Sequence, residues 1–257
     1  MNSIKLFVVF FLSVLLSLVL TPSAQSSPLQ SSQSVLWTYS GEAGADAWGD
    51  LSSKFVACRQ GKQQSPIALD KTFKASLGSI EFDYKDTPFK AINNGHTIEV
   101  KYEHGSSIKI EGKQYELQQF HFHAPSEHTI GSQNYPIELH LVHKNKDGEL
   151  AVIGVFLKEG KPNELIQTLL ANLPGKEGEE TVKDIRINAN ALSPTDKSYY
   201  HYSGSLTTPP CSEGVNWYVL KTPIEVSQEQ IAKFASVYSE NARPIQPLNQ
   251  RVIEVKE

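Results

Sequence analysis

Three of the eight histidines in the chain lie in one short stretch, QQFHFHAPSEH, at positions His121, His123 and His128. Because side chains on a β-strand alternate between its two faces, His121 and His123 would point the same way. His140 lies in IELHLVH, which has the pattern of a second strand. If the two strands are neighbours, three neutral imidazoles converge and leave the fourth tetrahedral position of Zn²⁺ open for water. The spacing therefore indicates a catalytic zinc site, although an H-x-H pair is also typical of two half-exposed polar side chains.

Strand alternation also identifies the residues that would surround these histidines. Steps of two place Gln119 and Leu117 on the face of the H-x-H pair, and Glu138 and Val142 on the face of His140. The stretch does not match H-E-x-x-H, the helical motif of one large class of zinc proteases. The pattern therefore favours a metal site that is built on strands.

Strand patterns dominate the segments that must position these side chains. HTIEVKYEHGSSIKIEG alternates and turns at His104-Gly105, as a hairpin does. The segments YELQQFHFH, IELHLVH, ELAVIGVFLK and VNWYVLKTPIEV follow as further strands. Asp147-Gly148 is a turn pair between the second and third of them.

Helical patterns are few. Apolar residues recur at helical spacing between Pro162 and Pro174, which bound one helix. Ser227 and Gln230 have the spacing of a capping box before IAKFASVYSEN, the second helix. Residues 35–257 contain no linker or repeat, so local patterns predict a single β-dominated domain with peripheral helices.

The N-terminus has the pattern of a secretory signal. Lys5 precedes the apolar run LFVVFFLSVLLSLVL, and small and polar residues follow, so a signal peptide is predicted for residues 1–24. A retained membrane anchor is the alternative, but this run is shorter than the roughly 20 residues that a bilayer requires. Residues 25–34 are rich in Ser, Gln and Pro and are expected to form a disordered leader.

Charge and cysteine content restrict the partners and the compartment. The formal net charge is −4 with no basic run, so neither nucleic-acid binding nor stable membrane association after signal cleavage is expected. The two cysteines are Cys58 and Cys211. They would be reduced core thiols in the cytosol, whereas export favours a disulfide. A periplasmic or secreted protein is predicted.

Seven fragments in register give the chain a specific resemblance. FHFHAPSEHT, ELHLVH and SLTTPPC occur in order, and NNGH, GKQQSPI, WTY…WGDL and NARPIQPLNQR agree as well. From about Trp37 to Arg251 the chain resembles the α-class carbonic anhydrases of a bacterial or plant-like branch. This implies a lyase in which a zinc-bound hydroxide reversibly hydrates carbon dioxide to bicarbonate and a proton. The implied fold is mainly β (α+β): a single domain with a large twisted, mainly antiparallel sheet and peripheral short helices.

The resemblance also assigns the residues around the metal. His121, His123 and His140 would be the Zn²⁺ ligands, in agreement with the strand-face argument. Gln119 and Glu138 would accept hydrogen bonds from ligand imidazoles and so fix their tautomers.

Thr207 of SLTTPP would accept a hydrogen bond from the hydroxide and donate one to Glu127. His128 directly follows Glu127, and adjacent strand residues point to opposite faces, so we expect His128 to support structure instead of binding zinc. Cys58 and Cys211 match the disulfide of secreted members, which would tether the loop of Thr207. The family also suggests cis peptide bonds before Pro66 and Pro210.

Carbon dioxide is apolar, so its binding site requires apolar side chains. The residues that match the family's substrate site are Val142, Val152, Leu206, Thr207, Thr208, Val215 and Trp217. Each apolar member taken alone would equally be an ordinary core residue.

His96 in NNGH matches the family's proton-transfer histidine, and a side-chain pKa near 6.5 suits that role. Tyr39, Asn94 and Thr208 would hold the waters between His96 and zinc. An exposed turn histidine without a role is the alternative. Glu99 replaces a neutral side chain of many animal members, and its charge is expected to disturb the pKa of His96.

Two other functions remain open on the same residues. One is a non-catalytic binding or storage protein on the same scaffold, and the other is a zinc hydrolase that acts on esters. Such non-catalytic relatives lose zinc histidines or the gatekeeping pair, whereas this chain retains Glu127 and Thr207 with all three histidines. The oligomeric state is not predicted, and both a monomer and a homodimer remain open.

Overall fold

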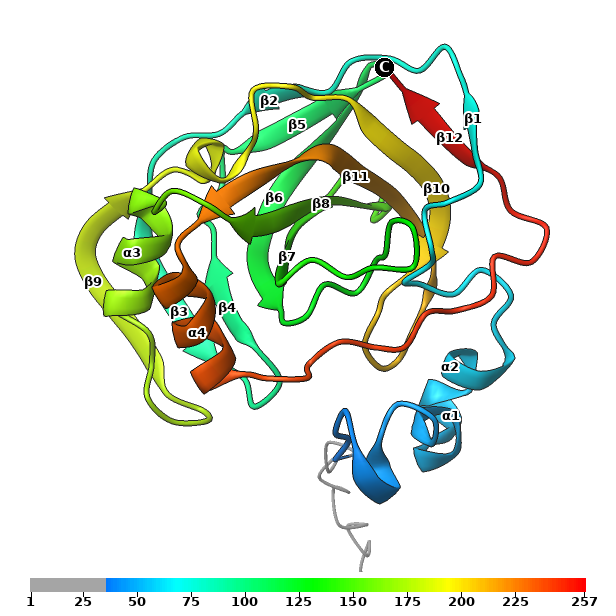
Figure 1. Cartoon of the computed structure of the whole chain (residues 1–257), viewed down its shortest axis with the longest axis horizontal. Helices are drawn as coiled ribbons and strands as arrows, with labels where there is room; N and C mark the ends of the chain where they lie inside the picture. Colours follow the sequence, from blue (N-terminus) through cyan, green and yellow to red (C-terminus); the bar gives the residue numbers. More distant parts are fainter. Residues whose placement is uncertain (1–35) are drawn as a thin grey trace, which may run out of the picture. The chain divides into compact units, whose positions relative to one another are not determined.

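The computed structural model describes residues 36–257, so the predicted signal peptide (1–24) and leader (25–34) lie outside the described residues. One sheet of twelve strands organises the described part of the chain (Figure 1). The strands are β1 (Thr72–Lys74), β2 (Glu81–Asp83), β3 (Thr87–Asn93), β4 (Ile98–Lys101), β5 (Ser107–Ile110), β6 (Lys113–His123), β7 (Ile137–Lys144), β8 (Leu150–Glu159), β9 (Glu180–Ile187), β10 (Tyr199–Ser205), β11 (Glu213–Val226) and β12 (Ile253–Lys256).

The strands follow the order β1-β12-β10-β11-β8-β7-β6-β4-β3-β9, with β5 paired to β6 and β2 paired to β5. Two pairings, β1 with β12 and β8 with β11, are parallel, and the others are antiparallel. The sheet twists strongly along this order, as right-handed strand twist requires (Figure 1). The predicted fold class, a large twisted and mainly antiparallel sheet, is therefore confirmed.

Short helices lie at the periphery, as predicted. The α-helices are α1 (Trp48–Leu51), α2 (Ala57–Gln60), α3 (Glu164–Ala171) and α4 (Gln228–Val237), and the 3₁₀ helices are η1 (Gly41–Ala43), η2 (Ser53–Phe55) and η3 (Ala189–Leu192). The capping box of Ser227 and Gln230 is present at the start of α4. Helix α3 begins after Asn163, whose side chain accepts a hydrogen bond from the backbone N–H of Ile166, and ends before Pro174.

Apolar side chains are buried on both faces of the sheet. The larger core covers the face against which α3 and α4 pack, and it includes Phe120 and Phe122 of β6. A smaller core covers the other face and includes Val152, Val215 and Trp217. Because side chains of β6 alternate between the two faces of the sheet, His121 and His123 face away from the larger core. The face that carries His121 and His123, the histidine face, is thus opposite the face covered by α3 and α4.

The predicted hairpin at His104-Gly105 is wrong. The chain does turn there, with Gly105 at φ 108°, but β4 and β5 do not pair with each other. Both pair instead with β6, whose eleven residues are long enough to carry the two short strands in succession. The alternating pattern identified the strands correctly but carries no information about their partner.

A bulge in β6 also corrects the predicted face of Leu117. The register with β7 shifts between Leu117 and Gln119, so the residues on either side of Gln118 switch faces. Leu117 is therefore buried in the larger core, whereas Gln119 lies on the histidine face. The bulge turns the remainder of β6 so that His121 and His123 leave the core.

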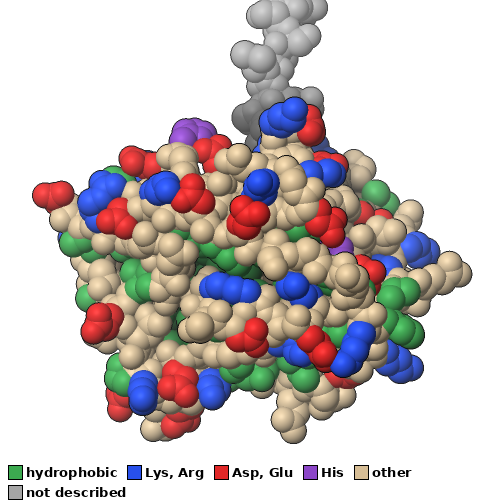
Figure 2. Space-filling model, turned by 90° about the horizontal axis from the view of Figure 1, so that it is seen from above, with side chains coloured by type: hydrophobic (Ala, Val, Ile, Leu, Met, Phe, Trp, Pro, Cys, Tyr) green, Lys and Arg blue, Asp and Glu red, His purple; other side chains and the backbone are tan. Residues whose placement is uncertain are grey.

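Lysine, arginine and acidic side chains are interspersed over the face of the molecule in Figure 2. None of the helices within residues 36–257 is both long and apolar enough to cross a membrane.

Candidate metal centre

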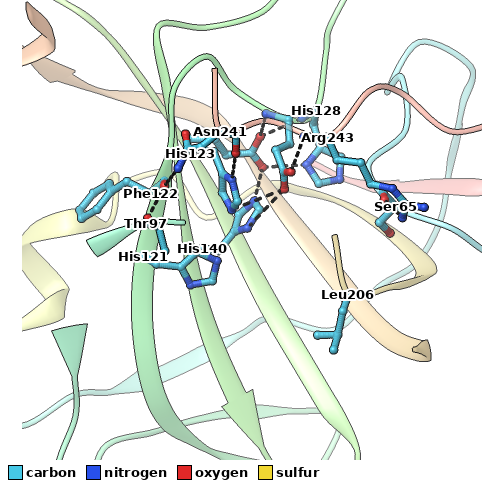
Figure 3. Close-up of polar contacts among 12 residues, drawn as sticks. Ser65, Thr97, His121, Phe122, His123, His128, His140, Leu206, Asn241 and Arg243 are labelled. Atoms are coloured by element: carbon cyan, nitrogen blue, oxygen red, sulfur yellow. Dashed lines mark hydrogen bonds and ion pairs between the residues drawn. The ribbon is translucent and has the colours of Figure 1, made fainter. Parts of the chain in front are cut away.

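The structure brings His121, His123 and His140 together. Strands β6 and β7 are antiparallel neighbours, and His121 lies directly opposite His140 in their register. The three imidazoles point toward one another (Figure 3), with ligand nitrogens all within 4.8 Å of one another. His123 and His140 are buried and His121 is half-buried. Two neighbouring strands therefore supply all three rings without any loop rearrangement.

Each of the three rings donates one N–H to a protein oxygen. The acceptors are Gln119 Oε1 for Nδ1 of His121 at 2.8 Å, the Asn241 carbonyl for Nδ1 of His123 at 2.7 Å, and Glu138 Oε1 for Nε2 of His140 at 3.0 Å. These acceptors carry no proton, so they fix the tautomer of each ring and leave the other nitrogen as a lone-pair donor. In these three rings, the nitrogens that have no hydrogen bond within residues 36–257 are Nε2 of His121, Nε2 of His123 and Nδ1 of His140.

Electrostatics disfavours the charged form of two of these rings, since the pKa values of His121 and His123 are lowered. Burial lowers the pKa of His121 well below its usual value, and the neighbouring His123 and His140 lower it further. Burial also lowers the pKa of His123, although the Glu127 charge opposes this effect. Nε2 of His123 is buried without a hydrogen-bond partner among residues 36–257. A buried, unprotonated nitrogen in this position is suited to a metal ion.

His128 belongs to the support of the site. Its Nδ1 donates to Glu138 Oε1 at 2.7 Å and its Nε2 is hydrogen-bonded to the Tyr202 hydroxyl at 2.6 Å. The sequence analysis placed His128 on a strand next to Glu127, with its side chain on the opposite face. That reason is wrong, since β6 ends at His123 and residues 124–128 do not lie on a strand. Both ring nitrogens of His128 are hydrogen-bonded to protein groups, so we still expect it to support the structure and not to bind the metal.

Glu138 connects these histidines. Besides two imidazole N–H groups, its carboxylate accepts the backbone N–H groups of Glu127 and His128 at 3.0 and 2.9 Å. Burial alone raises the pKa of Glu138, but the imidazoles of His128 and His140 outweigh it, so the pKa lies well below the usual range. Glu138 therefore stays ionised and orients the ring of His140.

Glu127 lies beside the cluster with one oxygen unpaired. Its Oε1 accepts the backbone N–H of Arg243 at 2.9 Å, while its Oε2 lies 3.5 Å from Nε2 of His123 and has no hydrogen-bond partner among the described residues. The predicted hydrogen bond from the Thr207 hydroxyl is therefore not formed in this structure. Thr207 is nevertheless buried, and Glu127 Oε2 remains a free acceptor.

The loop that carries Thr207 is fixed at both ends. Cys58 and Cys211 form the predicted disulfide, with their Cα atoms 5.0 Å apart. The backbone N–H of Cys211 donates to the Thr208 carbonyl at 2.8 Å, and that of Leu206 donates to the Ser212 carbonyl at 3.0 Å. The predicted cis peptide bonds before Pro66 and Pro210 are present, and a third, before Pro125, was not predicted.

The predicted apolar substrate residues lie on the histidine face of the sheet. Val152, Val215 and Trp217 are almost fully buried in the smaller core, and Val142 and Leu206 pack against that core with part of their surface free. The Trp217 ring lies 4.8 Å from the His140 ring. Val142 and Leu206 can therefore touch a ligand, whereas the other three form the wall behind them.

His96 lies at the rim, in the turn between β3 and β4. Asn94 Oδ1 accepts the backbone N–H of His96 at 3.0 Å, so its side chain shapes the turn. The His96 ring stacks on Trp37 with ring centroids 3.5 Å apart, and the Tyr39 ring lies 6.5 Å away. Burial lowers the pKa of His96. Glu99 lies in β4 opposite His121, and burial raises the pKa of its carboxyl group.

The sequence analysis missed two residues that complete the site, Asn241 and Arg243. Asn241 holds Nδ1 of His123 through its carbonyl, and Arg243 holds Glu127 through its backbone N–H. The Arg243 guanidinium is buried and donates to Gln64 Oε1 and to the Cys58 carbonyl, and burial lowers its pKa to about 10. Both residues belong to NARPIQPLNQR, which carried the resemblance but was assigned no role.

Comparison with known proteins agrees with this geometry. The profile of the eukaryotic-type carbonic anhydrase family matches residues 43–257. A carbonic anhydrase of Klebsiella pneumoniae is 46% identical over 221 residues, which cover 84% of this chain and 89% of that protein.

Solved structures agree as well. A hyperthermostable carbonic anhydrase from an active hydrothermal vent chimney superimposes with a TM-score of 0.84 at 49% identity, covering 86% of this chain and all of that one. Dioscorin in complex with ascorbate is more distant, with a TM-score of 0.79 at 29% identity over 86% of this chain and 98% of that one. The chain belongs to the eukaryotic-type, or α-class, carbonic anhydrase family and is a carbonic anhydrase.

Proposed function

We propose that this carbonic anhydrase is a zinc enzyme that reversibly hydrates carbon dioxide to bicarbonate and a proton. The observation that carries the proposal is the donor set of His121, His123 and His140. Each ring has one nitrogen committed to a protein acceptor and one nitrogen without a hydrogen bond within residues 36–257, and this second nitrogen is buried in His123. Three convergent imidazoles that each offer one nitrogen fit Zn²⁺, whose fourth position would be left for water.

A Zn²⁺ ion held by His121, His123 and His140 would supply the nucleophile, because zinc lowers the pKa of a coordinated water to about 7, a value established for carbonic anhydrases in general. Gln119, Glu138 and the Asn241 carbonyl hold the ligand rings in their binding tautomers. These partners spare the site the entropic cost of ordering the ligands when the metal binds.

We assign Glu127 and Thr207 to the orientation of the attacking oxygen. Glu127 Oε2 is a buried acceptor that has no hydrogen-bond partner in the described part of the chain, and the Thr207 hydroxyl is the donor that we assign to it. A threonine that donates to Glu127 can accept a hydrogen bond only through its remaining lone pairs, and this fixes the direction of the nucleophile. Thr208, beside it, contributes to the substrate site.

Carbon dioxide would bind against the free surfaces of Val142 and Leu206, with Val152, Val215 and Trp217 behind them. His96 would carry the released proton from the site to solvent, through waters held by Tyr39, Asn94 and Thr208. The shuttle must move on each turnover, and stacking on Trp37 leaves both ring nitrogens of His96 free of hydrogen bonds within the described residues.

The compartment is part of the proposal. The Cys58–Cys211 disulfide supports an oxidising location. With the signal-peptide pattern of residues 1–24, we propose export to the periplasm or the medium.

Metal analysis combined with stopped-flow carbon dioxide hydration tests the function. We expect one zinc per chain and a hydration rate far above that of ester hydrolysis by the same sample. Bound zinc without hydration would instead indicate a binding protein on this scaffold, and faster turnover of esters would indicate a hydrolase.

A further inference from the structure

The loop before β9 is docked on the turn that carries His96. The backbone N–H of Asn93 donates to the Glu179 carbonyl at 3.0 Å, and the N–H of Gly178 donates to the Asn93 carbonyl at 2.8 Å. Glu179 Oε2 accepts the N–H groups of Gly175 and Lys176, which closes the loop on itself. The loop is therefore held in place against the turn.

Gly95 lets one side chain of that loop approach His96. Gly95 has φ 84°, and a Cβ atom built on it would lie 2.6 Å from Oε1 and 2.8 Å from Cδ of Glu177. Any other residue would displace this carboxylate or strain the turn. The Glu177 carboxylate therefore packs on the backbone next to His96.

The residues that contact His96 in the described part of the chain, Trp37, Asn94 and Asn241, carry no charge. Trp37 covers one face of the ring, and Tyr39, whose pKa burial raises well above its usual value, lies beyond it. Asn94 and Asn241 hold the backbone N–H and carbonyl of His96. Burial disfavours the charged ring, and the negative charge of Glu177 opposes this.

We propose that Glu177 is a positioning residue for proton transfer: its carboxylate stabilises the imidazolium form of His96 and so allows a half-buried ring to accept the proton. This inference rests on the proposed function, in which His96 carries the proton. A histidine covered by Trp37 would otherwise become a weaker base than the group that delivers the proton, and transfer would be uphill.

The test is a comparison of the wild-type protein as purified with Glu177→Gln. In NMR titrations, with the His96 ring resonance assigned from His96→Ala, we expect the pKa of His96 to fall by roughly 0.5 to 1 in the variant. Turnover in weak buffer should fall by about two- to fivefold, as expected for a weaker proton acceptor. The ratio kcat/KM should not change, and a concentrated imidazole buffer should remove the difference in turnover.

Glu180→Gln is the matched control. It removes the same charge three residues after Glu177, from a solvent-exposed ion pair with Lys90. It should leave both the pKa of His96 and turnover unchanged. An unchanged pKa of His96 in Glu177→Gln, or an equal shift in both variants, would overturn the proposal. A wild-type protein that does not hydrate carbon dioxide would contradict the proposed function, whereas the titration would still decide whether Glu177 acts on His96.

Discussion

Two histidine sites in this molecule differ in how firmly they hold their rings. On β6 and β7, each of His121, His123 and His140 donates a hydrogen bond to a protein oxygen, and burial lowers the pKa of the first two. At the rim, the turn holds the backbone of His96, but its ring only stacks on Trp37. The same side chain is fixed in one place and left free in the other.

The difference agrees with the two roles that we propose for these histidines. A metal ligand needs one lone pair in a constant direction and must not gain a proton, so burial and a fixed tautomer both serve it. A proton carrier must gain and lose a proton at nearly equal free energy, so its ring must stay accessible and close to its usual pKa. Burial strengthens the first role and weakens the second.

The largest effect that tests this comparison is the loss of a ligand ring. Replacing His123 with alanine leaves two imidazoles, which cannot close the tetrahedral site. We expect almost no bound zinc and a loss of hydration by roughly three orders of magnitude or more, because the metal supplies the nucleophile. Metal analysis of the dialysed protein and stopped-flow hydration measure the two quantities.

His128→Gln is the control for that experiment, since His128 is equally buried and lies in the same network. This variant should be less stable than the wild type, because the hydrogen bonds of His128 with Glu138 and Tyr202 are changed, but it should keep its zinc. Full zinc occupancy in His123→Ala, or loss of zinc in His128→Gln at a temperature where the variant is folded, would contradict the ligand assignment.

Strand periodicity was enough to predict that His121 and His123 share a face, because alternation is a local property of the chain. The prediction for His140 carried the condition that its strand is a neighbour of the first, and the β6–β7 pairing meets this condition. Strand periodicity failed at Leu117, since one extra residue at Gln118 reverses the alternation without altering the composition. It failed again for the partner of the strand after Gly105, because that strand pairs with β6, which follows it directly across the turn at Glu111-Gly112.

Long-range contacts to irregular backbone could not be predicted from the sequence either. Asn241 reaches His123 through a main-chain carbonyl, which any residue type carries, so its identity gives no signal for this contact. Glu177 acts on His96 only because Gly95 leaves space and because the loop before β9 docks on the turn. Gln119 and Glu138, which lie on the histidine strands themselves, could thus be predicted as partners of the rings, whereas Asn241 and Glu177, which lie on irregular backbone, could not.

His143 separates burial from metal binding and gives the second test. It lies on β7 three residues after His140, fully buried, with Nε2 hydrogen-bonded to the Tyr84 hydroxyl at 2.8 Å, and burial lowers its pKa to about 3. The unfolded chain binds a proton near pH 6.5 and the folded one does not, so stability is complete above pH 6.5 and decreases as the pH falls toward 3. By pH 4 this costs roughly 3 kcal/mol.

Chemical unfolding of wild type and His143→Phe between pH 4 and 8 measures this effect. The variant should be less stable at pH 7, because Tyr84 loses its partner, but its stability should decrease less steeply toward low pH. Release of zinc by acid adds the same slope to both proteins and therefore cancels in the difference. Parallel pH profiles would show that His143 does not stay neutral in the folded protein.

The smallest expected effect concerns the free ring. His96→Ala leaves the three ligand rings and the apolar wall intact, so carbon dioxide binding and attack, and with them kcat/KM, should not change. Only export of the proton slows, and turnover in weak buffer should fall by roughly an order of magnitude, less than is usual for a general acid–base group because solvent can substitute in part. Concentrated imidazole buffer should restore turnover.

His104→Ala, which removes an exposed histidine from another turn, is the control and should have no effect on turnover. If His96→Ala turns over as fast as wild type in weak buffer, the free ring at the rim is not the proton carrier, and its contrast with the fixed rings has no catalytic meaning.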